Sequence, residues 1–166
     1  MTSEKIVNKQ DILEKITPVI EKLAQEQNLI LLETDFVKEA GNWHLRIFIY
    51  SQDHPVSHED CENLTKNLSE YADSLIPVNY YLEVSSPGIN RKLKSSREYN
   101  IFRDKQVEIK LKQPEESSGE KIFTAKILEY SPDAGLKVEK TDNNKIFYIK
   151  EENISFVKLQ LNKEIK

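Results

Sequence analysis

Glycine, cysteine and long apolar runs are scarce in this 166-residue chain, and each shortage excludes a class of protein. Its four scattered glycines cannot form a G-x-x-x-x-G-K-S/T or a G-x-G-x-x-G loop, so a phosphate cradle of either kind is excluded. The single cysteine, Cys61, excludes an internal disulfide. No apolar run approaches the ~20 residues of a membrane helix, and MTSEKIVNKQ lacks the apolar core of a signal peptide. We therefore expect a cytoplasmic protein with no membrane association and no bound cofactor.

One group of side chains offers the donor atoms of a metal site. It consists of Asp53, His54, His58, Cys61 and Glu62. Structural zinc sites usually contain paired Cys or His spacings, and this chain has only one cysteine. We therefore interpret the group as a capped helix with solvent-facing histidines and a buried thiol, and we expect no metal.

A serine nucleophile would have to lie at the end of a predicted strand. Ser85 or Ser86 precedes a sharp turn there, and His44 would be the base. The G-x-S-x-G elbow is absent, and Pro87 stands where a helix N-terminus with free N–H donors is needed. We therefore expect a binding protein without catalytic activity.

The formal net charge of −4 hides an asymmetry between the two halves of the chain. Residues 1–88 hold 15 acidic and 7 basic side chains, whereas residues 89–166 hold 13 acidic and 17 basic ones. The excess is concentrated in residues 89–105, which hold six basic and two acidic residues. A focused basic patch is a plausible footprint for RNA or for an acidic protein surface. The acidic first half would repel phosphate unless it faces away.

The first half alternates between helix and strand patterns. The predicted elements are a helix over residues 9–27, strands over 29–38 and 43–50, a helix between Ser57 and Pro77, and a strand over 78–85. Pro18 predicts a kink in the first helix, or two helical pieces. The first two strands predict an antiparallel hairpin. Together the elements predict an α+β domain with two helices on one face of a three-stranded sheet.

The second half is dominated by strand patterns. After a short helical turn at residues 97–102, five strands are predicted over 106–112, 121–130, 136–140, 145–150 and 154–159. Short strands separated by turn residues, without a long helix, favour a small barrel of SH3-like or Sm-like type. The predicted organisation is an N-terminal α+β domain over residues 1–88, a basic hinge over 89–104, and the barrel over 105–166.

The two halves meet at a rigid turn that precedes the basic residues. Pro87 has no N–H and restricts the residue before it, and Gly88 can take positive φ, so the turn has defined chemistry. Arginine contacts phosphate in bidentate fashion and stacks on bases, which suits RNA. The alternative is a solvated linker in which Tyr99 and Phe102 pack the turn between the domains.

The sheet face without helices is a second possible RNA surface. It carries Arg46, Phe48, Tyr50 and Tyr81, which could stack single-stranded bases. The surrounding carboxylates argue against it: Glu33, Asp35 and Glu83.

The junction also resembles a known family. LEVSSPG, followed by Arg91 and Leu93 and then by REYNIF, is similar to the signature of the bacterial ribosome maturation factor RimP family. The order of predicted elements resembles that family across most of the chain. Asn90 and Lys92 stand where the family usually has Asp and Pro. The resemblance implies transient binding to the immature small (30S) ribosomal subunit and promotion of its maturation.

We expect rRNA phosphates to meet the basic hinge and a ribosomal protein to meet the loops or an edge strand of the barrel. The expected partner-binding residues are Ser85, Ser86, Pro87, Gly88, Arg91, Lys92, Lys94, Arg97 and Arg103. Arg91 is either a contact or a latch between the domains, and we expect a monomer. The alternative is a generic Sm-like RNA-binding regulator that acts on free RNA, and an uncharacterised hydrolase is a distant third.

Overall fold

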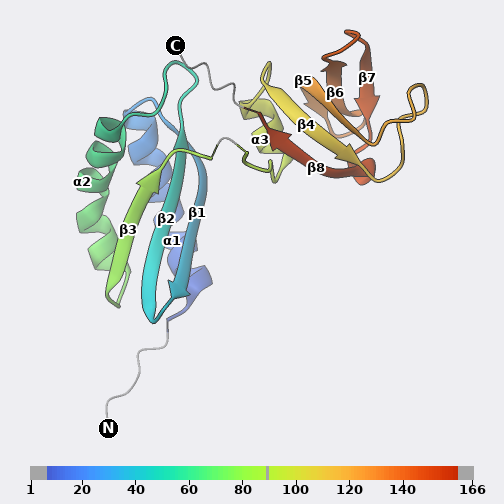
Figure 1. Ribbon diagram of the computed structural model, residues 1–166. Helices are drawn as coiled ribbons and strands as arrows, with labels where there is room; N and C mark the ends of the chain where they lie inside the picture. Colours follow the sequence, from blue (N-terminus) through green and yellow to red (C-terminus); the bar gives the residue numbers. More distant parts are fainter. Residues whose placement is uncertain (1–6, 89, 161–166) are drawn as a thin grey trace. The chain divides into compact units, whose positions relative to one another are not determined.

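The computed structural model describes residues 7–88 and 90–160, and the chain divides into two compact units, Met1–Pro87 and Gly88–Lys166. Each unit contains one sheet (Figure 1). Ile89, the first residue of the predicted hinge, lies outside the described residues. In the described part of the chain no helix is long and apolar enough to cross a membrane.

The first unit has two helices on one face of a three-stranded sheet (Figure 1). Its elements are α1 (Lys9–Glu26), β1 (Ile30–Glu39), β2 (Asn42–Tyr50), α2 (His58–Leu75) and β3 (Tyr80–Ser85). The sheet order is β1-β2-β3, in which β1 and β2 are antiparallel and β2 and β3 are parallel. The predicted α+β class and the predicted hairpin are confirmed.

α1 is one helix of 18 residues that runs through Pro18, so the prediction of two helical pieces is wrong. Its apolar stripe, Ile12, Ile16, Ile20 and Ala24, is buried along the full length of the helix. Pro18 is exposed, so its ring lies away from that stripe. Packing of both halves against the core outweighs the one backbone hydrogen bond that proline cannot donate.

The core of the first unit lies between the helices and the inner face of the sheet. Leu45, Ile47 and Ile49 of β2 are fully buried there. The single tryptophan, Trp43, stacks on Phe36 with ring centroids 4.6 Å apart. Trp43 therefore reports on the packing of the first unit alone.

α2 begins with a capping box. The Ser57 hydroxyl accepts from the Asp60 N–H at 3.0 Å, and the Asp60 carboxylate accepts from the Ser57 N–H at 3.0 Å. His54 Nε2 lies 3.1 Å from the same carboxylate. The predicted cap is confirmed. Of the side chains considered for a metal site, His54 contacts the capping carboxylate and His58 is the first residue of α2. Among the residues that the structure describes, no group of three potential ligands could hold a metal ion.

The second unit is an all-antiparallel sheet with one short helix and a 3₁₀ turn. Its elements are α3 (Ser96–Ile101), β4 (Gln106–Leu111), β5 (Ile122–Ser131), β6 (Gly135–Lys140), β7 (Ile146–Ile149), the 3₁₀ turn Glu151–Asn153 and β8 (Ile154–Leu159). The strand order β7-β6-β5-β4-β8 makes the first strand a neighbour of both the second and the last. This five-stranded arrangement is consistent with the predicted SH3-like or Sm-like class.

Candidate functional site

The residues after the rigid turn attach directly to β8. Leu93 N–H donates to Val157 O at 2.8 Å, and Leu159 N–H donates to Arg91 O at 2.7 Å. Lys92 forms an isolated antiparallel bridge with Lys158. Residues 91–93 therefore continue the sheet of the second unit past β8. We predicted this stretch as part of a hinge, and the structure instead gives it regular backbone partners.

Arg91 is held by a buried carboxylate. Its Nε lies 2.8 Å from Glu98 Oε1, and the two side chains are 8% and 5% exposed. A charge buried at this level needs a partner, because the cost of removing it from water is several kcal/mol. The pair fastens the start of the segment to α3, within the second unit. This geometry favours a structural role for Arg91 over a direct phosphate contact.

The other cations of the segment point to solvent. Lys92, Lys94, Arg97, Arg103 and Lys105 are all exposed, and we call them the basic set. Lys92 Nζ lies 5.2 Å from the centre of the Phe156 ring, and Lys158 Nζ lies 5.3 Å from the same ring. The short span from residue 92 to residue 105 therefore presents five cations at the surface of one unit.

The aromatic residues of the segment are buried instead. Phe102 is fully buried, and Tyr99 is 6% exposed and packs on Tyr130 with ring centroids 5.5 Å apart. Burial raises the pKa of Tyr99 to about 12. α3 thus packs its aromatics on β5, and these rings are not available to stack on bases. The segment therefore separates into exposed cations and buried rings, and Tyr99 and Phe102 pack, as the alternative interpretation of these aromatics expected.

The turn Ser85-Ser86-Pro87-Gly88 is mostly exposed. Ser85 closes β3 opposite Phe48, and only Pro87 of the four residues is buried. Gly88 is not among the residues with positive φ, although its C=O accepts from the Arg91 N–H at 3.2 Å. The positive φ that we expected there is therefore not used.

The strand register separates the serine and the histidine that were considered as a nucleophile and its base. His44 lies opposite Tyr81 and stacks on it at 5.4 Å, whereas Ser85 lies opposite Phe48. Four residues of extended chain therefore separate Ser85 from the partner of His44, and no Ser–His pair forms here.

The open sheet face does not fit a stacking platform. The Arg46 guanidinium donates two hydrogen bonds to Glu39 and one to Glu83, all at 2.8 Å. These bonds raise the pKa of Arg46 and lower that of Glu39, so the cation is already neutralised. Of the proposed platform rings, Tyr50 is only 8% exposed, whereas Tyr81 is 58% exposed.

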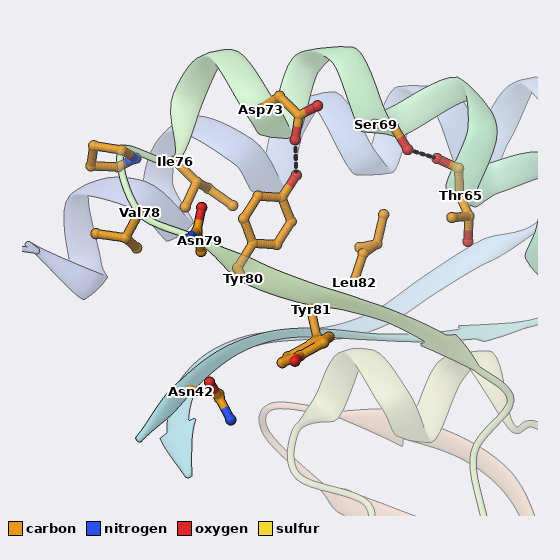
Figure 2. Close-up of a pocket in the computed structure, with 11 residues that line it drawn as sticks. Asn42, Thr65, Ser69, Asp73, Ile76, Val78, Asn79, Tyr80, Tyr81 and Leu82 are labelled. Carbon is orange, nitrogen blue, oxygen red and sulfur yellow. Dashed lines mark hydrogen bonds between the residues drawn. The ribbon is translucent and has the colours of Figure 1, made fainter. Parts of the chain in front are cut away.

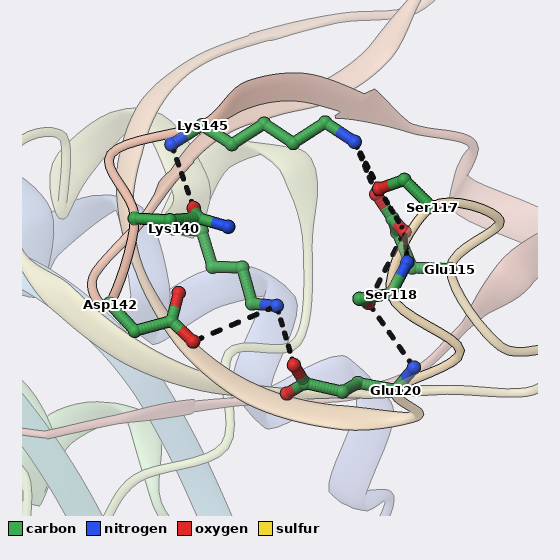
Figure 3. Close-up of polar contacts among 8 residues, drawn as sticks. Glu115, Ser117, Ser118, Glu120, Lys140, Asp142 and Lys145 are labelled. Atoms are coloured by element: carbon green, nitrogen blue, oxygen red, sulfur yellow. Dashed lines mark hydrogen bonds and ion pairs between the residues drawn. The ribbon is translucent and has the colours of Figure 1, made fainter.

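Two lysines of the second unit are likewise paired (Figure 3). Lys140 Nζ is buried and lies 2.7 Å from Glu120, and Lys145 Nζ lies 3.1 Å from Glu115 and also contacts Ser117. The hydrogen bond from Ser117 lowers the pKa of Glu115 to about 2. The cations of this group are therefore compensated locally.

A groove in the first unit was not indicated by any motif. It runs between α2 and β3 and is lined by Thr65, Ser69 and Asp73 from the helix (Figure 2). Their spacing of four residues is the only sequence signal, and it shows only that they share one helix face.

Comparison with protein families gives a match to the RimP N-terminal domain over residues 19–90. The matched stretch begins within α1, includes the whole three-stranded sheet with α2, and ends at the turn before Arg91. It therefore contains the strand and turn on which the sequence resemblance rested. Residues 19–90 are therefore a RimP N-terminal domain, and this match supports the RimP family to which the sequence resemblance pointed.

Proposed function

We propose that this protein binds the immature small ribosomal subunit and promotes its maturation without catalysing a reaction. The observation that carries the proposal is the match of residues 19–90 to the RimP N-terminal domain. The exposed basic set supports it, because rRNA offers a dense array of phosphates and five surface cations suit such a partner.

The two units have complementary tasks in this proposal. The basic set of the second unit meets rRNA phosphates, and the acidic first unit turns away from them. A loop or an edge strand of the second unit contacts a ribosomal protein. Two weak contacts made by one chain raise the effective concentration of each, so modest surfaces give stable but reversible binding.

The test is co-sedimentation of the full chain with isolated small subunits, large subunits and assembled ribosomes, at low and moderate salt. We expect selective pelleting with free small subunits. The variant Lys94→Ala/Arg97→Ala/Arg103→Ala should lose most of that binding while keeping its circular dichroism spectrum. Equal binding to all three particles, lost on adding salt, would reject the proposal.

A matched control separates local contacts from net charge. Lys110, Lys112 and Lys121 are also exposed and lie at or after the end of β4, whereas Lys94, Arg97 and Arg103 precede its start in the chain. Their triple Ala variant removes the same charge and should keep subunit binding within about twofold. Equal losses in both triple variants would mean that only total charge matters.

The small antiparallel sheet with surface cations also suits a regulator that binds free RNA. That function predicts tight binding of short single-stranded RNA with a steep dependence on salt. Micromolar or weaker binding to such RNA, beside tight binding to small subunits, would exclude it.

A further inference from the structure

An open groove of about 1120 Å³ follows the outer edge of β3 in the first unit. Figure 2 shows Thr65, Ser69 and Asp73 along α2 on one side of it and the residues of β3 on the other. The Tyr80 hydroxyl donates to Asp73 at 2.7 Å, which fixes the distance between helix and strand at one end. The groove therefore has a helical wall and a strand wall.

The strand wall is a free sheet edge. β3 is the last strand in the order β1-β2-β3, and in the described residues nothing pairs with its second edge. Alternate residues of this six-residue strand direct their N–H and C=O groups away from β2. Such an edge is a template for a further strand, and proteins that do not use it normally cover it.

The side chains of β3 that face the helices are incompletely covered. Leu82 lies opposite Leu45 and Val84 opposite Ile47 in the parallel register. Leu45 and Ile47 are fully buried, whereas Leu82 and Val84 are only half-buried although they pack against the same core. The apolar layer therefore continues to the edge of the sheet and lacks a neighbour there. An added strand would bury this surface.

The helical wall leaves room for that strand. Thr65 and Ser69 are small, and each hydroxyl donates to a carbonyl of its own helix, at 2.8 Å and 2.7 Å. Neither side chain needs a ligand to satisfy its donor. The wall can thus accept side chains of an incoming peptide without leaving a buried polar group unpaired.

The charge around the groove is negative. α2 carries five acidic residues and one lysine, and that lysine, Lys66, lies 3.6 Å from Glu62. Asp73 faces the groove, and in the described part of the chain no lysine or arginine lines it. An occupant with positive charge complements this wall, whereas a nucleic acid strand would be repelled by it.

We propose that this groove binds an extended basic peptide segment of a partner protein, which pairs with the free edge of β3 as a fourth strand and places a Lys or Arg side chain against Asp73. The groove belongs to a different unit from the basic set, so this inference goes beyond the proposed function. Main-chain hydrogen bonds would give the affinity, and the carboxylate would select cationic sequences.

The test uses the full chain and a fluorescein-labelled twelve-residue peptide of alternating Lys and Val, with Glu in place of Lys in the control peptide. Binding is measured by fluorescence anisotropy. We expect the Lys peptide to bind and the Glu peptide not to bind. Asp73→Asn keeps an acceptor for the Tyr80 hydroxyl and removes only the charge, and it should weaken binding at least fivefold.

Matched variants on the same helix make the test specific. Glu70→Gln removes one charge from an exposed position that does not line the groove, and it should change affinity less than twofold. Ser69→Arg fills the groove and should abolish binding, whereas Asn67→Arg adds the same side chain at an exposed position and should bind more than tenfold better than Ser69→Arg. Equal effects of Asp73→Asn and Glu70→Gln would overturn the proposal.

Hydrogen exchange gives a readout that charge attraction alone would not change. Strand addition should slow exchange of amides in residues 80–85 when the Lys peptide is bound, by at least tenfold. Unchanged exchange in β3 would overturn the proposal. So would concentration-dependent dimerisation in light scattering that Ser69→Arg abolishes, because a second copy would then occupy the edge. None of these outcomes depends on whether the chain binds ribosomal subunits.

Discussion

Arg91 and Glu98 are the residues whose roles change most between sequence and structure. The sequence places Arg91 in a recognisable motif and leaves open whether it is a partner contact or a latch between the domains. The structure buries it beside Glu98 at 2.8 Å. No local pattern indicated that Glu98, seven residues further on, would be its partner, because the pairing depends on how α3 packs against β5.

The first prediction concerns this pair. Arg91→Ala leaves the Glu98 carboxylate buried without its partner and should lower the free energy of unfolding of the second unit by about 3 kcal/mol. The double variant Arg91→Met/Glu98→Met removes both charges and should recover most of that loss. Urea unfolding followed by circular dichroism measures both changes.

Trp43 fluorescence supplies the control for that experiment, since the only tryptophan lies in the first unit. Its urea midpoint should be the same in wild type and in Arg91→Ala. A loss below about 0.5 kcal/mol in the second unit would contradict a structural role and would restore Arg91 as a candidate contact.

Gly135 gives a second prediction at this scale. It has a φ of +91°, and a Cβ there would lie 2.1 Å from the backbone oxygen of Ile149. Gly119 has a φ of +73° with no atom within 4 Å of a Cβ. Gly119→Ala should therefore lower the free energy of unfolding of the second unit by only about 1 kcal/mol, the cost of placing an alanine in the left-handed conformation. Gly135→Ala should cost clearly more in the same unfolding assay, and equal costs would show that β6 and β7 separate easily.

At the scale of elements, helix caps and the alternating pattern of strands could be predicted from the sequence. The continuity of a helix through proline and the position of a strand at the edge of a sheet could not. The cap at Ser57 could be predicted because a serine hydroxyl accepts a backbone N–H of the first helical turn, which is a local interaction. The continuity of α1 through Pro18 could not be predicted, because it depends on the packing of α1 against the core, a long-range interaction. The groove along β3 was invisible for the same reason: it requires β3 to be parallel to β2 and last in the sheet.

The capping box of α2 predicts a dependence on pH. The backbone hydrogen bond from Ser57 lowers the pKa of Asp60, with a further contribution from His54. A carboxylate whose pKa is lower in the folded state stabilises that state above its unfolded pKa, ~3.9, and the stabilisation is lost as pH falls through the folded value. Asp60→Asn should therefore destabilise the first unit by about 0.5 to 1 kcal/mol at pH 7.

The same variant should have a smaller effect at pH 2 than at pH 7, because the stabilisation by the wild-type charge declines below ~3.9. Trp43 fluorescence during urea unfolding at the two pH values measures the difference. A deficit that stays constant from pH 7 to pH 2 would show that the Asp60 charge does not stabilise the cap.

At the scale of the whole molecule, the two halves of the chain carry net charges of opposite sign. The first half has a net charge of −8, and the second half has a net charge of +4. The charge asymmetry could be predicted from composition. The structure adds that five cations of one short span are exposed and that Lys140 and Lys145 form ion pairs (Figure 3). Composition could not predict which side chains are exposed or which ion pairs form, because both depend on strand neighbours.

This division predicts a measurable salt dependence. If Lys94, Arg97 and Arg103 each contact one phosphate, their triple Ala variant should reduce the slope of log affinity against log salt by about 2 to 3. The Lys110/Lys112/Lys121 triple variant should leave the slope unchanged. Filter binding to purified small subunits between about 50 and 200 mM salt measures it, and identical slopes would exclude these side chains as phosphate contacts.

The most direct measurement compares the affinity of the full chain for immature and mature small subunits, purified separately and tested at the same moderate salt. We expect binding to immature particles at least tenfold tighter, with most of it lost in the Lys94→Ala/Arg97→Ala/Arg103→Ala variant. Equal affinity for immature subunits, mature subunits and large subunits would contradict a maturation factor and would leave only a nonspecific basic surface.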